Sequence, residues 1–306
     1  MQIIPGTHAG PNIRKYHHGE FPTEVLLDLK AETSVSVCLP ARNEATTVGE
    51  IVSILVRDLQ ATGVVDEIVV IDDHSTDRTA SVANAAGARV VSADSILTEH
   101  GPGHGKGEVL WKSLHEAHGD VIVWCDADLR SFDSRFVRGI LGPLLADPQV
   151  VFAKGHYHRP EPTDGAGGGR VTELVARPLL SMFFPELCGF LQPLSGEYGG
   201  RRAALEQVPF VCGYGVEVGL LIDMASRFGI SRMVQVDLDV RHHRNRPLPQ
   251  LSPQATAVAQ TILKRANPAM VDEMIGLWLA DGSMVPIQFE ERPPMVSIES
   301  YLARSA

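Results

Sequence analysis

Residues 120–128, Asp-Val-Ile-Val-Trp-Cys-Asp-Ala-Asp, form a short apolar run that ends directly in two aspartates. The run from Val121 to Cys125 is typical of a strand that is buried in a parallel sheet. Asp126 and Asp128 then follow at its end. Two neighbouring carboxylates are costly to place together unless a cation or hydrogen-bond donors neutralise them. The stretch therefore predicts a buried strand with an acidic end that binds a cation.

The segments before this strand alternate between strand and helix patterns. Apolar residues between Val48 and Leu59 recur at spacings of 3 and 1, which is one face of a helix. Two more helices are expected at residues 76–86, where Gly87 would form the C-cap, and at 108–117. The expected strands cover residues 34–40, 67–71, 88–91 and 120–125. This order predicts an α/β fold built on a right-handed parallel unit.

Polar residues cluster at the ends of three of these strands. The clusters are Arg42-Asn43-Glu44, Asp72-Asp73-His74 and Asp126-Ala127-Asp128. In open α/β sheets, ligands bind beyond the carboxyl ends of the strands. We therefore expect the three clusters to face one crevice.

The second half of the chain has a less regular pattern. We expect a loop at residues 160–169, which are rich in Pro and Gly, and an irregular tail from residue 281. Residues 241–246 form the densest basic stretch of the chain. The remaining expected elements are strands at 150–154 and 233–240 and helices at 171–184, 216–228 and 254–265.

The composition is that of a soluble globular protein. Hydrophobic residues make up 44% of the 306 residues, which is too many for a disordered chain. No run approaches the ~20 apolar residues of a membrane span. The N-terminal residues lack the order of a signal peptide, so we expect a cytoplasmic protein. A net charge of -10 argues against nucleic-acid partners.

The cysteines favour neither a zinc site nor a disulfide framework. They are widely separated, and none belongs to a Cys-x-x-Cys pair. We expect buried free thiols in a reducing compartment. The four residues are Cys38, Cys125, Cys188 and Cys212.

The Asp-x-Asp stretch favours a hard divalent cation. Magnesium and manganese prefer one or two carboxylates together with phosphate oxygens. A solvated loop or a helix cap is the alternative for such a pattern. Its position after a buried strand, with Asp72 and Asp73 ending an earlier strand, favours the cation.

Three motifs, in this order, resemble the nucleotide-sugar domain of GT-A fold glycosyltransferases. They are Leu39-Pro40-Ala41-Arg42-Asn43-Glu44, Ile71-Asp72-Asp73-His74-Ser75-Thr76-Asp77 and Asp126-Ala127-Asp128. Five downstream stretches resemble a narrower group, the glucosyl-3-phosphoglycerate and mannosyl-3-phosphoglycerate synthases, which are retaining enzymes of the same fold. These stretches are GKGEVLW (105–111), GGGRVTEL (167–174), QPLSGEY (192–198), GYGVE (213–217) and HRNRP (243–247).

The resemblance covers roughly residues 34–250 and implies a fold and a domain organisation. The fold class is α/β, a GT-A type, Rossmann-like mixed sheet flanked by helices, with a C-terminal acceptor-binding part. The implied divisions are an N-terminal arm (1–33), a nucleotide-sugar-binding part (34–155), an acceptor-binding and catalytic part (156–250) and a C-terminal helix and tail (251–306). The resemblance also suggests a homodimer.

The resemblance further implies a set of site residues. A divalent metal, Mg²⁺ or Mn²⁺, would be held by Asp128 and His243, and the catalytic residues would be Glu217, Lys106 and Asp128. The donor nucleotide sugar would be bound by Pro40, Ala41, Arg42, Glu44, Asp72, Lys106, Asp126, Ala127 and Tyr214. The acceptor, 3-phosphoglycerate, would be bound by Gly169, Arg170, Thr172, Arg241 and Asn245.

The residues themselves support these roles to different degrees. A glycine-rich loop that opens a helix offers amide groups and Arg170 to an anion, but it is also an ordinary linker. Lys106 fits a diphosphate ligand or a solvated loop lysine. Glu217 is equally a favourable acid in the first turn of a helix. His243 belongs to a basic patch, and His242 should point to the opposite side.

The expected activity is transfer of glucose or mannose from a nucleotide diphosphate to the 2-hydroxyl of 3-phosphoglycerate. The product would serve in making a compatible solute or a polysaccharide primer. Retention of configuration allows double displacement or front-face attack, of which we favour the second. The alternatives are an inverting transferase with a lipid or polysaccharide acceptor and a sugar-nucleotide-binding protein without turnover. The hexose and the base, uridine or guanosine, are left open.

Overall fold

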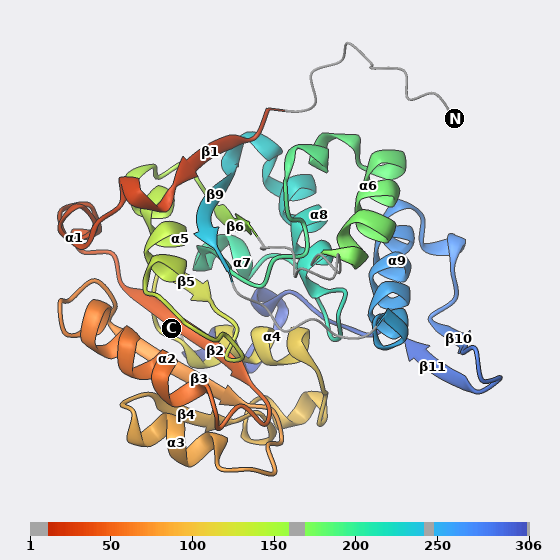
Figure 1. The fold of residues 1–306 in the computed structure, drawn as a ribbon, viewed down its shortest axis with the longest axis horizontal. Helices are drawn as coiled ribbons and strands as arrows, with labels where there is room; N and C mark the ends of the chain where they lie inside the picture. Colours follow the sequence, from red (N-terminus) through yellow and green to blue (C-terminus); the bar gives the residue numbers. More distant parts are fainter. Residues whose placement is uncertain (1–11, 159–168, 242–247, 305–306) are drawn as a thin grey trace.

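The computed structural model describes residues 12–158, 169–241 and 248–304 (Figure 1). One eight-stranded sheet forms its centre, with strands in the order β1-β9-β6-β7-β5-β2-β3-β4. The strand bounds are β1 Arg14–His17, β2 Val35–Ala41, β3 Glu67–Asp72, β4 Arg89–Ser92, β5 Val121–Trp124, β6 Phe152–His158, β7 Tyr198–Arg201 and β9 Met233–Val240.

The predicted parallel unit is confirmed. β2 pairs in parallel with β3 and β5, and β3 pairs in parallel with β4. β2 continues through Pro40, where the sequence predicted a stop. Its pairing with β5 ends at Cys38, so the missing N–H of Pro40 falls where only β3 lies alongside.

β7 makes the sheet mixed, as the resemblance implied. It runs antiparallel to both β5 and β6. The sequence pattern did not reveal it, because its centre is Gly199-Gly200 rather than an apolar run. A β-carbon at Gly199 would lie 2.5 Å from the carbonyl oxygen of Ile122, so glycine is needed for this close strand contact.

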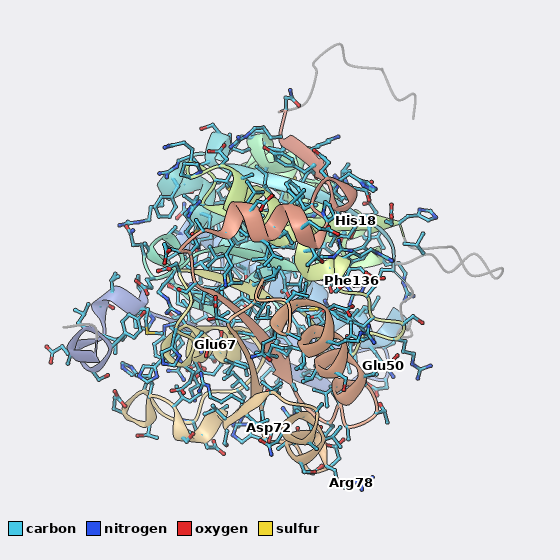
Figure 2. All side chains as sticks on the ribbon, turned by 90° about the vertical axis from the view of Figure 1, so that its left-hand side faces the viewer. His18, Glu50, Glu67, Asp72, Arg78 and Phe136 are labelled. Atoms are coloured by element: carbon cyan, nitrogen blue, oxygen red, sulfur yellow. The ribbon has the colours of Figure 1, made fainter. Side chains whose placement is uncertain are left out.

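Helices cover both faces of the sheet. Alternate residues of β2 enter two separate cores. Val37 and Leu39 lie in the core beneath α2 (Val48–Leu55) and α5 (Arg135–Ala146), and Cys38 lies in the core beneath α4 (Lys106–Glu116) and α8 (Val216–Phe228). Figure 2 views the molecule from the side of α1 (Thr23–Lys30) and α2, with Phe136 of α5 labelled. All four cysteines are free thiols.

Several elements were not predicted from the sequence. α1, α5 and β1 fall in segments for which we expected no regular structure. The tail from residue 281 is also regular in part, so the expectation of an irregular tail was wrong. The elements of the tail are β11 Met284–Gln288, β12 Glu291–Arg292 and α10 Glu299–Arg304. The remaining elements of the chain are α3 Thr79–Ala85, α6 Arg177–Phe183, α7 Arg202–Leu205, β8 Phe210–Val211, α9 Ser252–Ala266 and β10 Met274–Trp278. No helix in the described ranges is long and apolar enough to cross a bilayer.

The helix predicted at residues 171–184 contains a wider turn before its proline. A π-helical turn, Thr172–Ala176, precedes α6, and Pro178 is the second residue of α6. Proline has no N–H to donate within a helix, and a π turn accommodates such a break. The turn places Thr172 at the front of this helix, facing the cavity described below.

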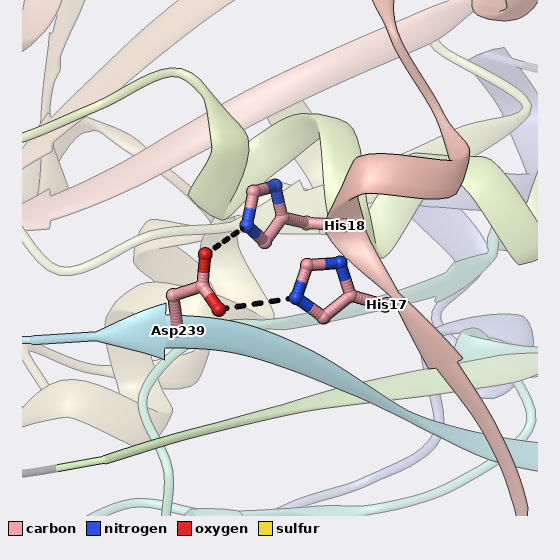
Figure 3. A group of neighbouring side chains, drawn as sticks. All are labelled: His17, His18 and Asp239. Carbon is pink, nitrogen blue, oxygen red and sulfur yellow. Dashed lines mark hydrogen bonds and ion pairs between the residues drawn. The ribbon is translucent and has the colours of Figure 1, made fainter.

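A His-His-Asp cluster fastens β1 to the end of β9 (Figure 3). His17 Nε2 lies 3.0 Å from Asp239 Oδ1, and His18 Nε2 lies 2.6 Å from Asp239 Oδ2. The amide of Gly19 donates to His17 Nδ1, so we assign the ring proton of His17 to Nε2. A metal ion on Nε2 would need the opposite tautomer. We therefore interpret the cluster as a hydrogen-bond clamp.

Candidate active site

A cavity of about 1040 Å³ opens beyond the carboxyl ends of β2 and β5. The structure brings nearly all of the predicted site residues to its wall, although they come from distant parts of the chain. The predicted residues that line it are Pro40, Ala41, Arg42, Glu44, Lys106, Asp126, Ala127, Asp128, Gly169, Arg170, Thr172, Tyr214, Glu217 and Arg241. His243 and Asn245 lie outside the described residues.

Lys106 joins two carboxylates at the centre of the cavity. It is the first residue of α4, and Gly105 before it adopts a positive φ of 95°. Lys106 Nζ lies 2.6 Å from Asp126 Oδ1 and 2.8 Å from Glu217 Oε1. Burial opposes the charged form of Lys106, but Asp126 and Glu217 outweigh it and hold the pKa of Lys106 well above its usual range. The lysine is therefore a fixed cation at the cavity wall.

Arg241, at the end of β9, holds the other side of Asp126. Its guanidinium lies 3.1 Å from Asp126 Oδ2 and 3.1 Å from Glu197 Oε2, and it also donates to the hydroxyl of Tyr157. Burial would raise the pKa of Asp126, but Lys106 and then Arg241 hold it below its usual range. Asp126 is thus ionised and fixed from both sides. The sequence assigned Arg241 to the acceptor, whereas its described contacts here are with cavity carboxylates and Tyr157.

Asp128 offers an exposed carboxylate at the same strand end. Half of its side chain is exposed, and Oδ1 lies 3.9 Å from Arg241 Nη2. Burial, followed by repulsion from Asp128, raises the pKa of the nearby Glu44 carboxyl. This accumulation of negative charge at the cavity wall fits a divalent cation, whose preferred ligands are carboxylate and phosphate oxygens.

Gly169, Arg170 and Thr172 also line the cavity, at the start of the helix that continues into α6. Gly169 has a φ of 88°, a conformation that favours glycine. The predicted glycine-rich entry to a helix is therefore present, with an arginine and a buried hydroxyl beside it. Such a wall suits an anionic group.

Asp73, not Asp72, lines the cavity at the end of β3. Asp72 Oδ1 is buried and has no hydrogen-bond partner among the described residues. His74 lies 2.8 Å from Asp73 Oδ1 and 2.7 Å from Asp94 Oδ1, and its ring centroid is 4.4 Å from that of His104. The hydrogen bond to Asp73 raises the pKa of His74. Both ring nitrogens therefore donate to carboxylates, as in a charged imidazolium.

Sequence reasoning missed several residues that shape the cavity. Gly196, Glu197 and Tyr157 contact its charged groups, and His104 lines its wall. Gly196 and Glu197 lie in the QPLSGEY stretch, which carried the resemblance but suggested no role for them. Tyr157 and His104 gave no signal, because only the folded sheet brings them to the cavity.

Comparisons with known proteins agree with this geometry. The family model of glycosyl transferase family 2 matches residues 36–213. The glucosyl-3-phosphoglycerate synthase of Mycolicibacterium smegmatis is 47% identical over 296 residues, which cover 92% of this chain and 96% of that protein. The synthase of the same name from Petrotoga mobilis is 42% identical over 311 residues, covering 94% and 95%.

The chain is also similar to solved structures of these synthases. The Mycobacterium tuberculosis glucosyl-3-phosphoglycerate synthase in complex with Mn²⁺, uridine-diphosphate-glucose and phosphoglyceric acid matches with a TM-score of 0.84 and 42% identity, covering 94% of this chain and 99% of that chain. Mannosyl-3-phosphoglycerate synthase from Rubrobacter xylanophilus matches with a TM-score of 0.84 and 37% identity, covering 93% and 97%.

Proposed function

Because the chain belongs to glycosyl transferase family 2, and within it to the glucosyl-3-phosphoglycerate and mannosyl-3-phosphoglycerate synthases, we propose that it transfers a hexose from a nucleotide diphosphate to 3-phosphoglycerate. The observation that carries the proposal is the cavity itself. It places a fixed lysine, the Asp126-Ala127-Asp128 strand end and an arginine-bearing helix start around one space.

The donor would lie along the ends of β2, β3 and β5. The residues that we assign to it are Pro40, Ala41, Arg42, Glu44, Asp126, Ala127 and Tyr214, with Asp73, which lines the cavity, in place of the predicted Asp72. Lys106 would bind the diphosphate, since a rigidly held ammonium group stabilises charge that develops on a leaving phosphate. Asp126 and Glu217 keep that ammonium in place.

A divalent metal, Mg²⁺ or Mn²⁺, would be held by Asp128 together with His243. Bound there, it would supply positive charge to the departing diphosphate. The acceptor would lie against Gly169, Arg170 and Thr172, with Asn245 on the other side and Arg241 reaching it only if its carboxylate contacts rearrange. An arginine fork is well matched to a phosphate or carboxylate group.

We favour a retaining, front-face transfer. The bond between the anomeric carbon and the diphosphate oxygen breaks, and a bond to the 2-hydroxyl oxygen of 3-phosphoglycerate forms on the same face. The hydroxyl proton passes to the departing phosphate oxygen. Glu217 would orient the donor sugar, because its carboxylate lies at the cavity wall in the first turn of α8. The product, a hexosyl-3-phosphoglycerate, would be a precursor of a compatible solute or a polysaccharide primer.

A homodimer and a cytoplasmic location are also proposed. The homodimer is supported by the hairpin of β10 and β11, which exposes Met274, Trp278 and Met284 on one face. A two-stranded hairpin with such a face is marginal in water by itself. We take its partner to be a second copy of the chain.

The direct test is a coupled assay with 3-phosphoglycerate and a panel of nucleotide sugars. UDP-glucose and GDP-mannose are the essential members, each with and without Mg²⁺ or Mn²⁺. We expect nucleoside diphosphate release that requires 3-phosphoglycerate and the metal. Tight binding without turnover would instead support a sugar-nucleotide-binding protein. Turnover with lipid or polysaccharide acceptors alone would support the inverting alternative.

A further inference from the structure

The loop that leads into Lys106 folds around the guanidinium group of Arg292, which lies in β12 of the C-terminal tail. Arg292 Nη1 donates to the carbonyl oxygen of His100 at 2.8 Å, and Nε donates to the carboxylate of Glu108. Between these two contacts the loop passes close to the same side chain, because a β-carbon at Gly103 would lie 2.3 Å from Arg292 Nη2. One guanidinium group therefore contacts the loop before, along and just after the segment that ends in Lys106.

Glu108 makes the contact with Arg292 costly to lose. Glu108 lies in the first turn of α4, two residues after Lys106, and is completely buried. Its carboxylate is bound by Arg292 on one side, and its Oε1 lies 3.1 Å from Lys112 Nζ on the other. Removing one partner from a buried ion pair is strongly destabilising, because it leaves a buried charge without full compensation. Relief of that cost would require the first turn of α4 to shift, and this turn carries Lys106.

β12 also contacts the segment that leads to Glu217. β12 pairs with β8, and the start of α4 packs directly against β8. A β-carbon at Gly107 would lie 1.7 Å from the carbonyl oxygen of Val211, so the contact between α4 and β8 is very close. The chain continues from β8 into α8, where Glu217 Oε1 lies 2.8 Å from Lys106 Nζ. The relative position of these two charged groups therefore depends on how α4, β8 and β12 pack together.

We propose that Arg292 is a positioning residue for Lys106, which holds the loop of residues 100–108 so that the ammonium group lies between Asp126 and Glu217. This inference rests on the proposed function, in which that ammonium binds the donor diphosphate. Arg292 does not line the cavity, and it lies outside the 36–213 match of the family model. Loss of its guanidinium group should therefore weaken donor binding through Lys106 and should change binding of 3-phosphoglycerate little.

The test is a double-mutant cycle of Arg292→Lys and Lys106→Met. The measured quantity is the Kd for UDP-glucose with Mn²⁺, by calorimetric titration without acceptor; GDP-mannose replaces UDP-glucose if the panel of nucleotide sugars selects it. Lysine keeps the positive charge, but it lacks the planar fork that reaches His100 and Glu108 together. We expect Arg292→Lys to weaken donor binding about tenfold when Lys106 is present and less than about twofold in Lys106→Met, because a positioning effect requires the group that is positioned.

The matched control is Arg265→Lys. Arg265 binds the carboxylates of Asp223 in α8 at 2.7 Å and of Glu291 in β12 at 2.8 Å, and it has no hydrogen bond to residues 99–108 in the part of the chain that the structure describes. Both arginine variants should lose a similar part of the free energy of unfolding, measured with urea. Only Arg292→Lys should change the Kd for the donor.

Two further measurements keep the test decisive. Should Arg292→Lys fail to fold, Gly103→Ala disturbs the same contact from the loop side and should weaken donor binding in the same way. Should Lys106→Met bind the donor too weakly for titration, steady-state kinetics decide. Arg292→Lys should then raise the KM for the donor and leave the KM for 3-phosphoglycerate within about twofold of the wild type.

The outcomes separate this inference from the proposed function. Equal effects of Arg292→Lys with and without Lys106, or equal effects of Arg292→Lys and Arg265→Lys on the donor Kd, would reduce Arg292 to a stabilising contact. A rise of both KM values by the same factor would do the same. A wild type that neither binds nor turns over any nucleotide sugar would overturn the proposed function as well.

Discussion

Gly196 lies against the carboxylate that anchors Lys106. A β-carbon there would lie 2.1 Å from Asp126 Oδ2, which is held by Arg241 at 3.1 Å and has little freedom to move. We expect Gly196→Ala to displace Asp126 and to raise the KM for the nucleotide sugar by at least about tenfold, the cost of one charge-assisted hydrogen bond. Steady-state kinetics with varied donor measure this.

Gly213→Ala is the matched control for that substitution. Gly213 also lines the cavity, but a β-carbon at this position would meet no atom within 4 Å. The control should retain wild-type kinetics. If Gly196→Ala and Gly213→Ala have the same KM for the nucleotide sugar, donor binding does not depend on the position of the Asp126 carboxylate.

Substitution of Arg170 tests the proposed acceptor site. Arg170→Ala should raise the KM for 3-phosphoglycerate about 10- to 100-fold, the range of a charge-assisted hydrogen bond to a phosphate or carboxylate, and should change the KM for the donor little. Arg177→Ala, later in the same helix, is the control, because Arg177 pairs with Glu173 and does not line the cavity. Equal effects of Arg170→Ala on both substrates would remove our acceptor assignment.

The sequence predicts best the elements whose apolar residues recur at the spacing of a helix or a strand. α8 and β9 begin and end at the predicted residues, 216–228 and 233–240. α5 was missed although it is largely buried, because Gly139, Gly142 and Pro143 interrupt its pattern. The reason for Gly142 lies far away in the sequence: a β-carbon there would lie 2.0 Å from the ring of Phe21.

The same limit applies to the site. The motifs that carry the family resemblance predicted most of the residues that line the cavity, including Lys106, Asp126 and Glu217. They did not assign a role to Glu197, because its contact with Arg241 joins segments that are distant in the sequence. Asp72 and Asp73 show a second limit, because a motif locates a strand end without telling which of two aspartates faces the cavity.

The hydrogen-bond clamp between β1 and β9 can be tested by a substitution of Asp239 and by the pH dependence of its effect on stability. Asp239→Asn replaces one accepting oxygen with an amide that cannot accept from a histidine N–H, while asparagine tolerates the φ of 62° at this position. We expect a loss of about 1 kcal/mol in the free energy of unfolding at pH 7. Urea unfolding measures the loss, and hydrogen exchange of residues 14–17 locates it.

The sign of the pH dependence follows from Asp239. Hydrogen bonds from His18 and then His17 lower its pKa in the folded protein. The stabilisation is therefore present above the unfolded pKa of about 3.9 and is lost as the pH falls through the folded value. The difference between wild type and Asp239→Asn should shrink at low pH. A difference that is constant between pH 7 and pH 3.5 would contradict the clamp, and Asp272→Asn on the exposed surface serves as the control.

At the scale of the whole molecule, exposed apolar side chains occur on neighbouring elements. The hairpin patch consists of Met274, Trp278 and Met284, and the exposed apolar residues of the helix that ends in α6 are Leu174 and Met182, of which Met182 is 71% exposed. In Figure 1, the hairpin, α9 and α6 lie along the same edge, with α9 in contact with both. Two apolar regions on neighbouring elements would suit a two-fold dimer in which each region of one copy meets the other region of its partner.

If the chain forms the proposed homodimer, Trp278→Asp should convert it into monomers. Trp278 is 73% exposed, faces the same side of the hairpin as Met284, and would carry much of a small interface as an aromatic anchor. Light scattering after size exclusion, over a range of protein concentrations, gives the mass directly.

Met182→Asp, in the helix that ends in α6, should have the same effect. Leu27→Asp, on an exposed position of α1 outside both regions, should leave the dimer intact. A monomeric wild type, or a Trp278→Asp protein that remains dimeric, would show that these regions do not join two copies of the chain.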